Sequence, residues 1–202
     1  MADGVIQMPV DSTGKMLRTR TRVVGGNTVH EQYVAMAADP TYYIWSTPAA
    51  AAANRQVLSL INNTAAQVIK VRKLFLINAA LAAVTGVGLQ YDVKRISTLS
   101  AGTAITPNPA DTADGAMANF TCAAGGTVTE GVLLYSYYTN NDEIGLTGGF
   151  PQATIQALIS LQPEGNEVKE LALRNGEGFT IKQITSSAVG TIGALAVVTV
   201  EV

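Results

Sequence analysis

Short apolar runs separated by glycine, asparagine and proline constrain the fold of this chain more than any other feature. Residues 56–61 and 67–77 are two such runs, and a turn-forming sequence lies between them at residues 62–64. Residues 86–96 alternate between apolar and polar side chains, which is typical of a half-buried strand. No segment shows the longer apolar period of an amphipathic helix. The pattern therefore predicts an all-β protein.

We predict eight strands in the main body of the chain. They are expected at residues 56–61, 67–77, 86–96, 128–138, 153–161, 167–174, 179–184 and 193–202. Eight antiparallel strands with long connections best match a jelly-roll-like β-sandwich, which we place at residues 54–202. The turn-rich segment at residues 97–119 is expected to be a functional loop, because long loops are uncommon in compact domains.

Residues 1–53 are predicted to form an N-terminal arm that contains a β-hairpin and an aromatic linker. The hairpin is expected at residues 15–36, and Arg18, Arg20 and Arg22 occupy alternate positions in its first strand. Alternate side chains of a strand point to one side, so the hairpin has a basic face. Because an isolated hairpin is marginally stable, we expect the arm to contact something other than its own body. Two interpretations of the three arginines stay open. Either their charges protect an exposed edge strand from pairing with another chain, or they contact acidic groups of a neighbouring subunit.

The low content of charged residues favours a protein that hides part of its surface in an assembly. Charged residues make up 14% of the chain and hydrophobic residues 48%, whereas charged residues average about 25% in proteins. Tyr42, Tyr43 and Trp45 lie together between two prolines, and such aromatic residues are enriched at interfaces. We therefore expect a symmetric homo-oligomer. A β-rich monomer with a surface of threonine, asparagine and serine is the alternative.

Charge and composition argue against several functional classes. The net charge is −2, which does not favour nonspecific binding to nucleic acid. The nearly apolar run at residues 74–89 is too short and too interrupted to span a membrane. The chain contains one histidine, His30, and one cysteine, Cys122, without clustered partners. We therefore expect no catalytic, cofactor-binding or metal-binding residues, and no enzymatic activity.

Three segments resemble virion structural proteins of tailed bacteriophages. The opening, residues 5–15 followed by Arg18-Thr19-Arg20 and residues 25–32, is similar to a "PxDSTGKxxRT" motif that precedes "Gxx(V)HEQ" in such proteins. Residues 102–107 with residues 111–114, and the stretch Leu173–Phe179, resemble further segments of the same group, whose usual ending is "LRxGEGxxIxQ" before a last strand. The resemblance covers the start, middle and end of the chain.

The resemblance implies a capsid decoration, or cement, protein. Proteins of this kind are usually oligomers, often trimers, that bind the major capsid protein at the capsid surface and stiffen the shell. The resemblance thus implies a homotrimer located on the virion. The alternative is a tail, baseplate or head-fibre protein that binds glycans on a host surface. That role would favour exposed aromatic residues in the segments 97–119 and 139–152.

Overall fold

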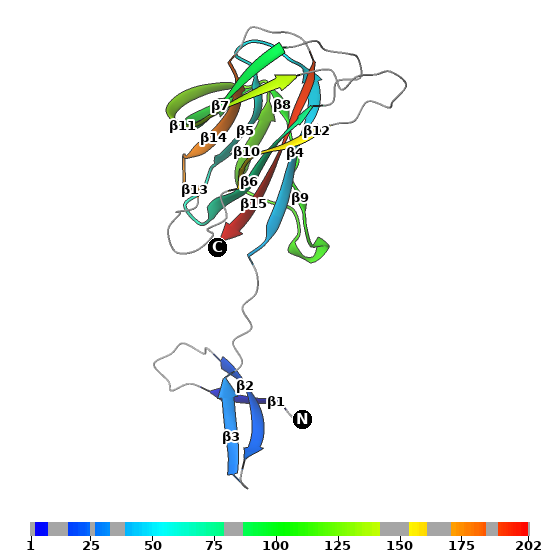
Figure 1. Ribbon diagram of the computed structural model, residues 1–202. Helices are drawn as coiled ribbons and strands as arrows, with labels where there is room; N and C mark the ends of the chain where they lie inside the picture. Colours follow the sequence, from blue (N-terminus) through cyan, green and yellow to red (C-terminus); the bar gives the residue numbers. More distant parts are fainter. Residues whose placement is uncertain are drawn as a thin grey trace. The chain divides into compact units, whose positions relative to one another are not determined.

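The computed structural model describes residues 3–7, 16–24, 27–32, 39–78, 87–141, 154–160, 171–184 and 190–201. Among these residues the regular elements are β-strands, apart from one turn of 3-10 helix at Thr112–Asp114 (Figure 1). The all-β prediction is thereby confirmed. In the part of the chain that the structure describes, no helix has the length and apolar character needed to cross a membrane.

The chain divides into two compact units, Met1–Ala38 and Asp39–Val202. In the first unit, β1 (Asp3–Gln7), β2 (Met16–Val24) and β3 (Asn27–Gln32) form an antiparallel sheet in the order β1-β2-β3, which we call the arm sheet. The predicted hairpin corresponds to β2 and β3, with Val24 opposite Asn27. Strand β1 lies outside the predicted hairpin at residues 15–36.

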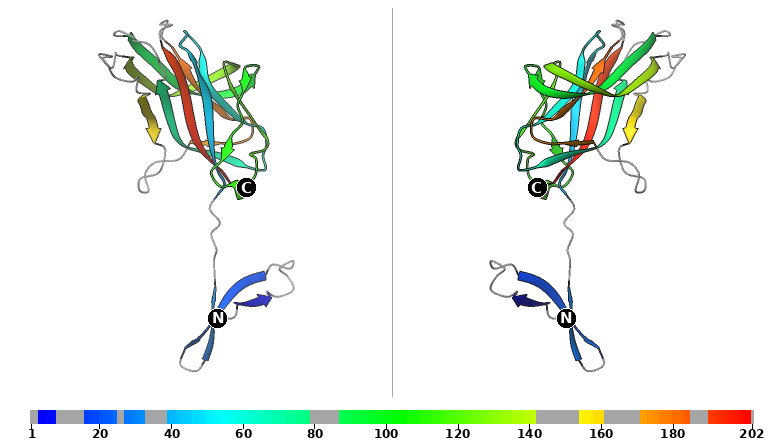
Figure 2. Two further views of the ribbon diagram at one scale, coloured as in Figure 1. Left: turned by 90° about the vertical axis from the view of Figure 1, so that its right-hand side faces the viewer. Right: turned by 90° about the vertical axis from the view of Figure 1, so that its left-hand side faces the viewer.

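The second unit is a sandwich of two antiparallel sheets (Figure 2). Sheet I has the order β12-β6-β15-β4-β9, and β13 pairs with β6 as well. Its strands are β4 (Thr41–Ala50), β6 (Val68–Asn78), β9 (Asn108–Pro109), β12 (Thr154–Ser160), β13 (Leu171–Leu173) and β15 (Thr191–Glu201). Sheet II has the order β11-β7-β14-β5-β10-β8. Its strands are β5 (Gln56–Asn62), β7 (Val87–Ser100), β8 (Thr103–Ala104), β10 (Phe120–Ala124), β11 (Thr127–Asn141) and β14 (Gly178–Gln183).

The long strands wind back and forth between the two sheets. Strands β4, β5, β6 and β7 alternate between sheet I and sheet II, and β11 then pairs with β7. The chain returns through β12, after which β14 inserts between β7 and β5, and β15 inserts between β6 and β4. The β-sandwich is confirmed. The jelly roll stays an interpretation, supported by this winding of eight long strands.

The inner faces of both sheets supply one hydrophobic core. Because successive side chains of a strand alternate between its faces, every second residue of β15 is buried, from Ala194 to Val200. The largest fully buried side chains include Ile44, Ile69 and Leu74 of sheet I and Leu58, Tyr91 and Phe179 of sheet II. The sandwich is therefore held mainly by apolar packing between its sheets.

The segment predicted as an aromatic linker belongs to the sandwich. Strand β4 runs from Thr41 to Ala50 and pairs with β15 along most of its length. The boundary between the two units lies between Ala38 and Asp39, not at the predicted residues 53 and 54. The sequence does not indicate this strand clearly, because proline, present at position 48, is depleted in strands and the alanines that follow it are not typical of them.

Candidate interaction surfaces

Strand β4 separates the three aromatic residues that were predicted to lie at an interface. Its side chains alternate between the two faces of sheet I. Tyr42 points into the core and is 4% exposed, whereas Tyr43 and Trp45 are 44% and 43% exposed. Tyr42 is therefore a core residue and not part of a surface. The other two aromatic side chains remain available for contacts.

Tyr43 and Trp45 belong to a larger apolar area on the outer side of sheet I. In the register of the sheet, Leu195 lies opposite both Trp45 and Phe75, and Val197 lies opposite Tyr43. We call these five residues the apolar face. Tyr43, Phe75, Leu195 and Val197 also line a shallow depression of about 450 Å³. Residues directly opposite on neighbouring strands contact each other, so the face is continuous across three strands.

Basic side chains border the apolar face. Arg72 and Lys73 line the same depression, and the Nε atom of Arg72 donates a hydrogen bond to Thr199 Oγ1 at 2.9 Å. The combination of an apolar centre and a polar border is typical of protein–protein interfaces. The signal for this surface is present in the sequence, because β6 and β15 carry apolar residues on both of their faces.

Trp45 also lines a pocket of about 410 Å³, which we call the Trp45 pocket. Strand β4 contributes Trp45, Thr47, Pro48 and Ala49 to its lining. The remaining lining residues come from sheet II and its connections: Arg55, Thr103, Ala104, Ile105, Thr106, Ala124 and Gly125. The pocket thus joins residues that lie far apart in the sequence.

Local backbone geometry places residues 103–106 against this pocket. Strand β8 pairs with β10, and the backbone N–H of Ile105 donates a hydrogen bond to the carbonyl of Cys122 at 3.0 Å. Gly102 precedes β8 with a φ of +85°, and a Cβ atom there would lie 2.7 Å from the nitrogen of Gly126. Only glycine fits this approach. The predicted functional loop at residues 97–119 therefore supplies part of a pocket wall.

Strand β11 exposes a second apolar area at one edge of sheet II. It pairs with β7 through a register that is interrupted by β-bulges between Thr129 and Tyr135. The exposed large apolar side chains on this strand are Val132, Leu133, Leu134, Tyr135 and Tyr138. An edge strand also presents unpaired backbone groups, so β11 is a second candidate for contact with another chain. The sequence predicted this strand but not its exposure.

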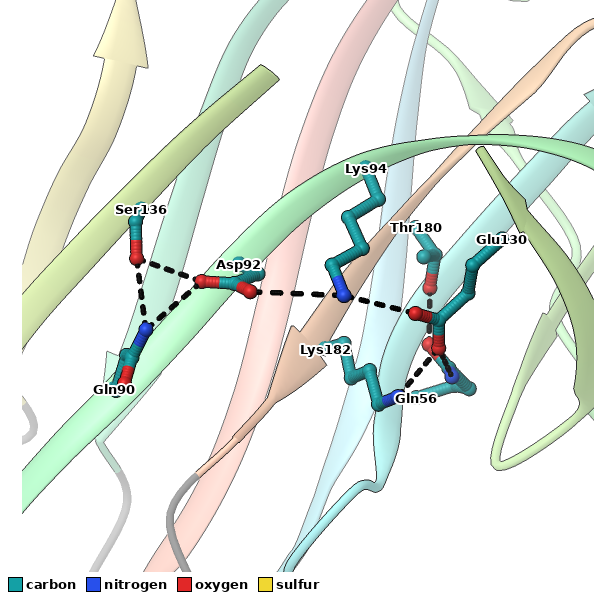
Figure 3. Close-up of polar contacts among 8 residues, drawn as sticks. All are labelled: Gln56, Gln90, Asp92, Lys94, Glu130, Ser136, Thr180 and Lys182. Atoms are coloured by element: carbon teal, nitrogen blue, oxygen red, sulfur yellow. Dashed lines mark hydrogen bonds and ion pairs between the residues drawn. The ribbon is translucent and has the colours of Figure 1, made fainter. Parts of the chain in front are cut away.

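Polar side chains on sheet II form a connected network (Figure 3). Lys94 and Lys182 both contact the carboxylate of Glu130, and the Lys94 Nζ–Glu130 Oε2 distance is 2.9 Å. Lys94 also lies 3.7 Å from Asp92, which accepts a hydrogen bond from Ser136 at 2.7 Å. The hydroxyl of Thr180 donates to Gln56 Oε1 at 2.6 Å, and Gln56 Nε2 lies 3.4 Å from Glu130 Oε1.

The network keeps Glu130 and Lys94 in their charged forms, which does not favour a role in proton transfer. Burial by itself would raise the pKa of Glu130, but the hydrogen bonds and charges of Lys182 and Lys94 outweigh it and lower that pKa to about 2. The hydrogen bond to Glu130 raises the pKa of Lys94. A general base works best when its pKa lies near the working pH, so Glu130 is poorly suited to that role at neutral pH.

The three arginines of the arm lie on β2. The backbone register places Arg20 opposite Asp3 of β1 and Glu31 of β3. Arg18 lies opposite Val5, and Arg22 lies opposite a valine of β3. Acidic positions therefore flank Arg20 inside the arm sheet, whereas apolar positions face the other two arginines. Substitution of Arg20 and substitution of the other two arginines can therefore be expected to differ in their effects.

Comparisons with known proteins identify no relative of this chain: no family model, no curated protein and no solved structure matches it. The resemblance of the three sequence segments to bacteriophage virion proteins therefore stays a prediction.

Proposed function

We propose that this chain is a structural protein of a bacteriophage virion that decorates the capsid. It forms a homo-oligomer, a trimer by resemblance, and binds the major capsid protein on the outer surface of the head. Each unit has its own role in this proposal. The sandwich makes the contacts between copies, and the arm sheet attaches to the capsid. The proposal needs no bound cofactor, metal or nucleic acid.

The observation that carries this proposal is the apolar face of sheet I. Tyr43 and Trp45 expose more than two fifths of their surface, next to Leu195, Val197 and Phe75 on the neighbouring strands. Contiguous exposed apolar areas of this kind mark interaction sites in soluble proteins. A second copy is the partner that fits best, because the chain has a low charge content and its apolar face has the composition of an interface core.

Charge supports an attachment role for the arm. Residues 1–35 contain four basic and three acidic residues, whereas the rest of the chain contains nine basic and twelve acidic residues. A mildly basic arm can dock on an acidic surface of a neighbouring copy or of the capsid. Ordering an extended segment costs about 1–2 kcal/mol per residue, so contacts with a partner must offset that cost.

Capsid binding by truncated and substituted proteins tests this proposal. We expect a chain of residues 39–202 to remain folded, as judged by circular dichroism, and to bind undecorated capsids poorly in a co-sedimentation assay. Arg18→Ala together with Arg22→Ala should weaken binding and reduce its salt dependence, because charge pairs between surfaces are screened by salt. Arg20→Ala is the matched control and should have the smaller effect, since acidic positions flank it within the arm sheet.

Two results would contradict the proposed role of the arm. One is unchanged capsid affinity of the truncated protein. The other is a truncated protein that no longer folds, which would show that residues 1–38 stabilise the sandwich directly.

A fibre or baseplate protein that binds host glycans is the second candidate function, and the Trp45 pocket favours it. Among the described residues of the segments 97–119 and 139–152, no large aromatic side chain is exposed, and residues 142–152 lie outside the described residues. However, Trp45 of β4 lines the same pocket as Thr103 and Thr106 of the first segment. The aromatic residue expected for glycan binding is thus supplied by a strand and not by the loop itself.

A further inference from the structure

Arg55 gives the Trp45 pocket a positive charge that no described carboxylate neutralises. Its Nη1 atom donates hydrogen bonds to the carbonyls of Ala49 at 2.7 Å and Ala50 at 2.8 Å. No acidic side chain in the described part of the chain forms an ion pair with Arg55. Partial burial lowers the pKa of Arg55, but an arginine remains charged at neutral pH. The guanidinium is therefore fixed in place, and its other nitrogens can bind an anion.

The other walls of the pocket present one aromatic ring and several hydroxyl groups. The indole of Trp45 is 43% exposed. The hydroxyls of Thr47, Thr103 and Thr106 make no hydrogen bond to any residue that the structure describes, and all three residues are exposed. A volume of about 410 Å³ lies within the range of about 300–1,000 Å³ that small-molecule sites have.

We propose that the Trp45 pocket binds a carboxylated saccharide, such as a uronic acid or a sialic acid. The indole of Trp45 stacks on the apolar C–H face of the sugar ring, and Arg55 pairs with the carboxylate through charge-assisted hydrogen bonds. The threonine hydroxyls bind the hydroxyls of the sugar. This inference goes beyond the capsid role. Because Trp45 belongs both to the apolar face and to the pocket, the inference requires that the indole stays accessible from the pocket when the apolar faces of two copies are in contact.

The walls of this pocket are held in place before any ligand binds. Trp45 lies opposite Leu195 in sheet I, and Thr103 lies opposite Ala124 in sheet II. The backbone of Arg55 is fixed at both its polar groups, since its N–H donates to the carbonyl of Ala52 and its carbonyl accepts from Gln183. Preorganisation of this kind reduces the entropy that binding costs.

Fluorescence of the full-length protein tests the site directly, because Trp45 is the single tryptophan of the chain. The probes are two pairs of sugars that differ in the carboxylate: glucuronate with glucose, and galacturonate with galactose. N-acetylneuraminate is titrated as a further acidic sugar. We expect a saturable change in tryptophan emission with at least one acidic sugar. Its neutral counterpart should bind about tenfold more weakly or worse, because a hydrogen bond to a charged group contributes about 1.5–3 kcal/mol.

Substitutions then assign the affinity to individual groups. Arg55→Gln should abolish the preference for the acidic sugar, and Thr106→Val should weaken binding of every sugar that binds. Arg174→Gln removes an exposed arginine outside the pocket, so it is the matched control and should leave sugar binding unchanged. Capsid binding of Arg55→Gln should be normal, which separates this inference from the decoration role.

Two results would overturn the inference. One is the absence of a saturable signal for all five sugars, both in fluorescence and in saturation-transfer NMR of the ligands. The other is equal affinity for the acidic and neutral members of each pair. The paired comparison uses the unsubstituted protein, so it decides the question even if Arg55→Gln fails to fold.

Discussion

The side chain of Asn62 joins two turns of the sandwich. It is fully buried at the end of β5, and its Nδ2 donates to the carbonyls of Gln67 at 2.9 Å and Leu173 at 3.0 Å. Its Oδ1 accepts from the backbone N–H of Thr64 at 3.2 Å. The side chain thus satisfies buried backbone groups on both sides of the β5–β6 turn. Replacing it would leave these groups without partners, which is more costly than losing an exposed hydrogen bond.

Asn62→Ala should therefore lower the free energy of unfolding by about 2–3 kcal/mol. Asn63→Ala is the matched control, because the neighbouring side chain is exposed and makes one contact with Thr121. The control should change the unfolding free energy by no more than about 0.5 kcal/mol. Urea denaturation of both variants measures the difference. Equal effects of the two substitutions would show that the buried hydrogen bonds of Asn62 contribute little.

Glu130 makes the stability of the sandwich depend on pH. Its pKa is lowered from 4.5 to about 2, since the contacts with Lys182 and Lys94 outweigh the effect of burial. A carboxylate with a lowered pKa stabilises the folded state fully above its unfolded pKa. That contribution is lost as the pH falls from about 4.5 to about 2.

Glu130→Gln should reduce stability at pH 7 by about 1–2 kcal/mol, given that this cluster is partly exposed. The difference between the variant and the unsubstituted protein should shrink as the pH is lowered toward 2. Urea denaturation at several pH values between 7 and 2 measures this. Glu201→Gln, which loses one exposed ion pair with Lys70, should have the smaller effect at pH 7. A Glu130→Gln deficit that stays constant down to pH 2 would exclude titration of Glu130 as its cause.

At the scale of elements, β4 has two separate roles. Its inward side chains, such as Ile44, complete the core, and its outward side chains, Tyr43 and Trp45, build the apolar face and the Trp45 pocket. Substitutions on the outward side can therefore change association without removing core contacts. Strand β11 provides a second exposed apolar area, so the two surfaces need to be compared.

Tyr43→Ser combined with Val197→Ser should weaken self-association at least about thirtyfold, since an aromatic residue at the centre of an interface typically contributes about 2 kcal/mol or more. The fold should be retained, because neither side chain belongs to the core. Sedimentation velocity measures the shift toward a species of 21.0 kDa. Val132→Ser combined with Leu133→Ser on β11 is the control. If the β11 variant dissociates and the β4 variant does not, the edge of sheet II is the interface.

Element by element, the sequence predicts the strands better than it predicts the surfaces. The hairpin of β2 and β3 and the long strands β5, β6, β7, β11 and β15 follow from apolar periodicity and turn residues. Strand β10 was not predicted, because its five residues, Phe-Thr-Cys-Ala-Ala, are too short a run to give a clear periodic signal. For β13, the described strand covers three residues of the eight-residue strand predicted at residues 167–174.

The candidate sites could be predicted only in part. The aromatic character of Tyr43 and Trp45 indicates an interface, but Phe75, Leu195 and Val197 look like ordinary core residues in the sequence. Their exposure depends on which face of sheet I is covered. The Trp45 pocket joins residues separated by up to about eighty positions, and such proximity follows from the winding of strands between the sheets rather than from local sequence.

At the scale of the whole molecule, the chain combines two units with different sequence character. The arm sheet holds three arginines on one strand, and the sandwich holds the apolar surfaces and the pocket. This division suits a protein that joins copies of itself through one unit and attaches to another surface through the other. We therefore expect substitutions to separate these two proposed roles.

An electron cryomicroscopy density map of the virion tests the central claim most directly. We expect the β-sandwich to fit symmetry-related density on the outer surface of the head, with the apolar faces of neighbouring copies in contact and the arm sheet against the major capsid protein. Density for this chain in the tail or baseplate, or isolated copies whose apolar faces are exposed to solvent, would contradict the account.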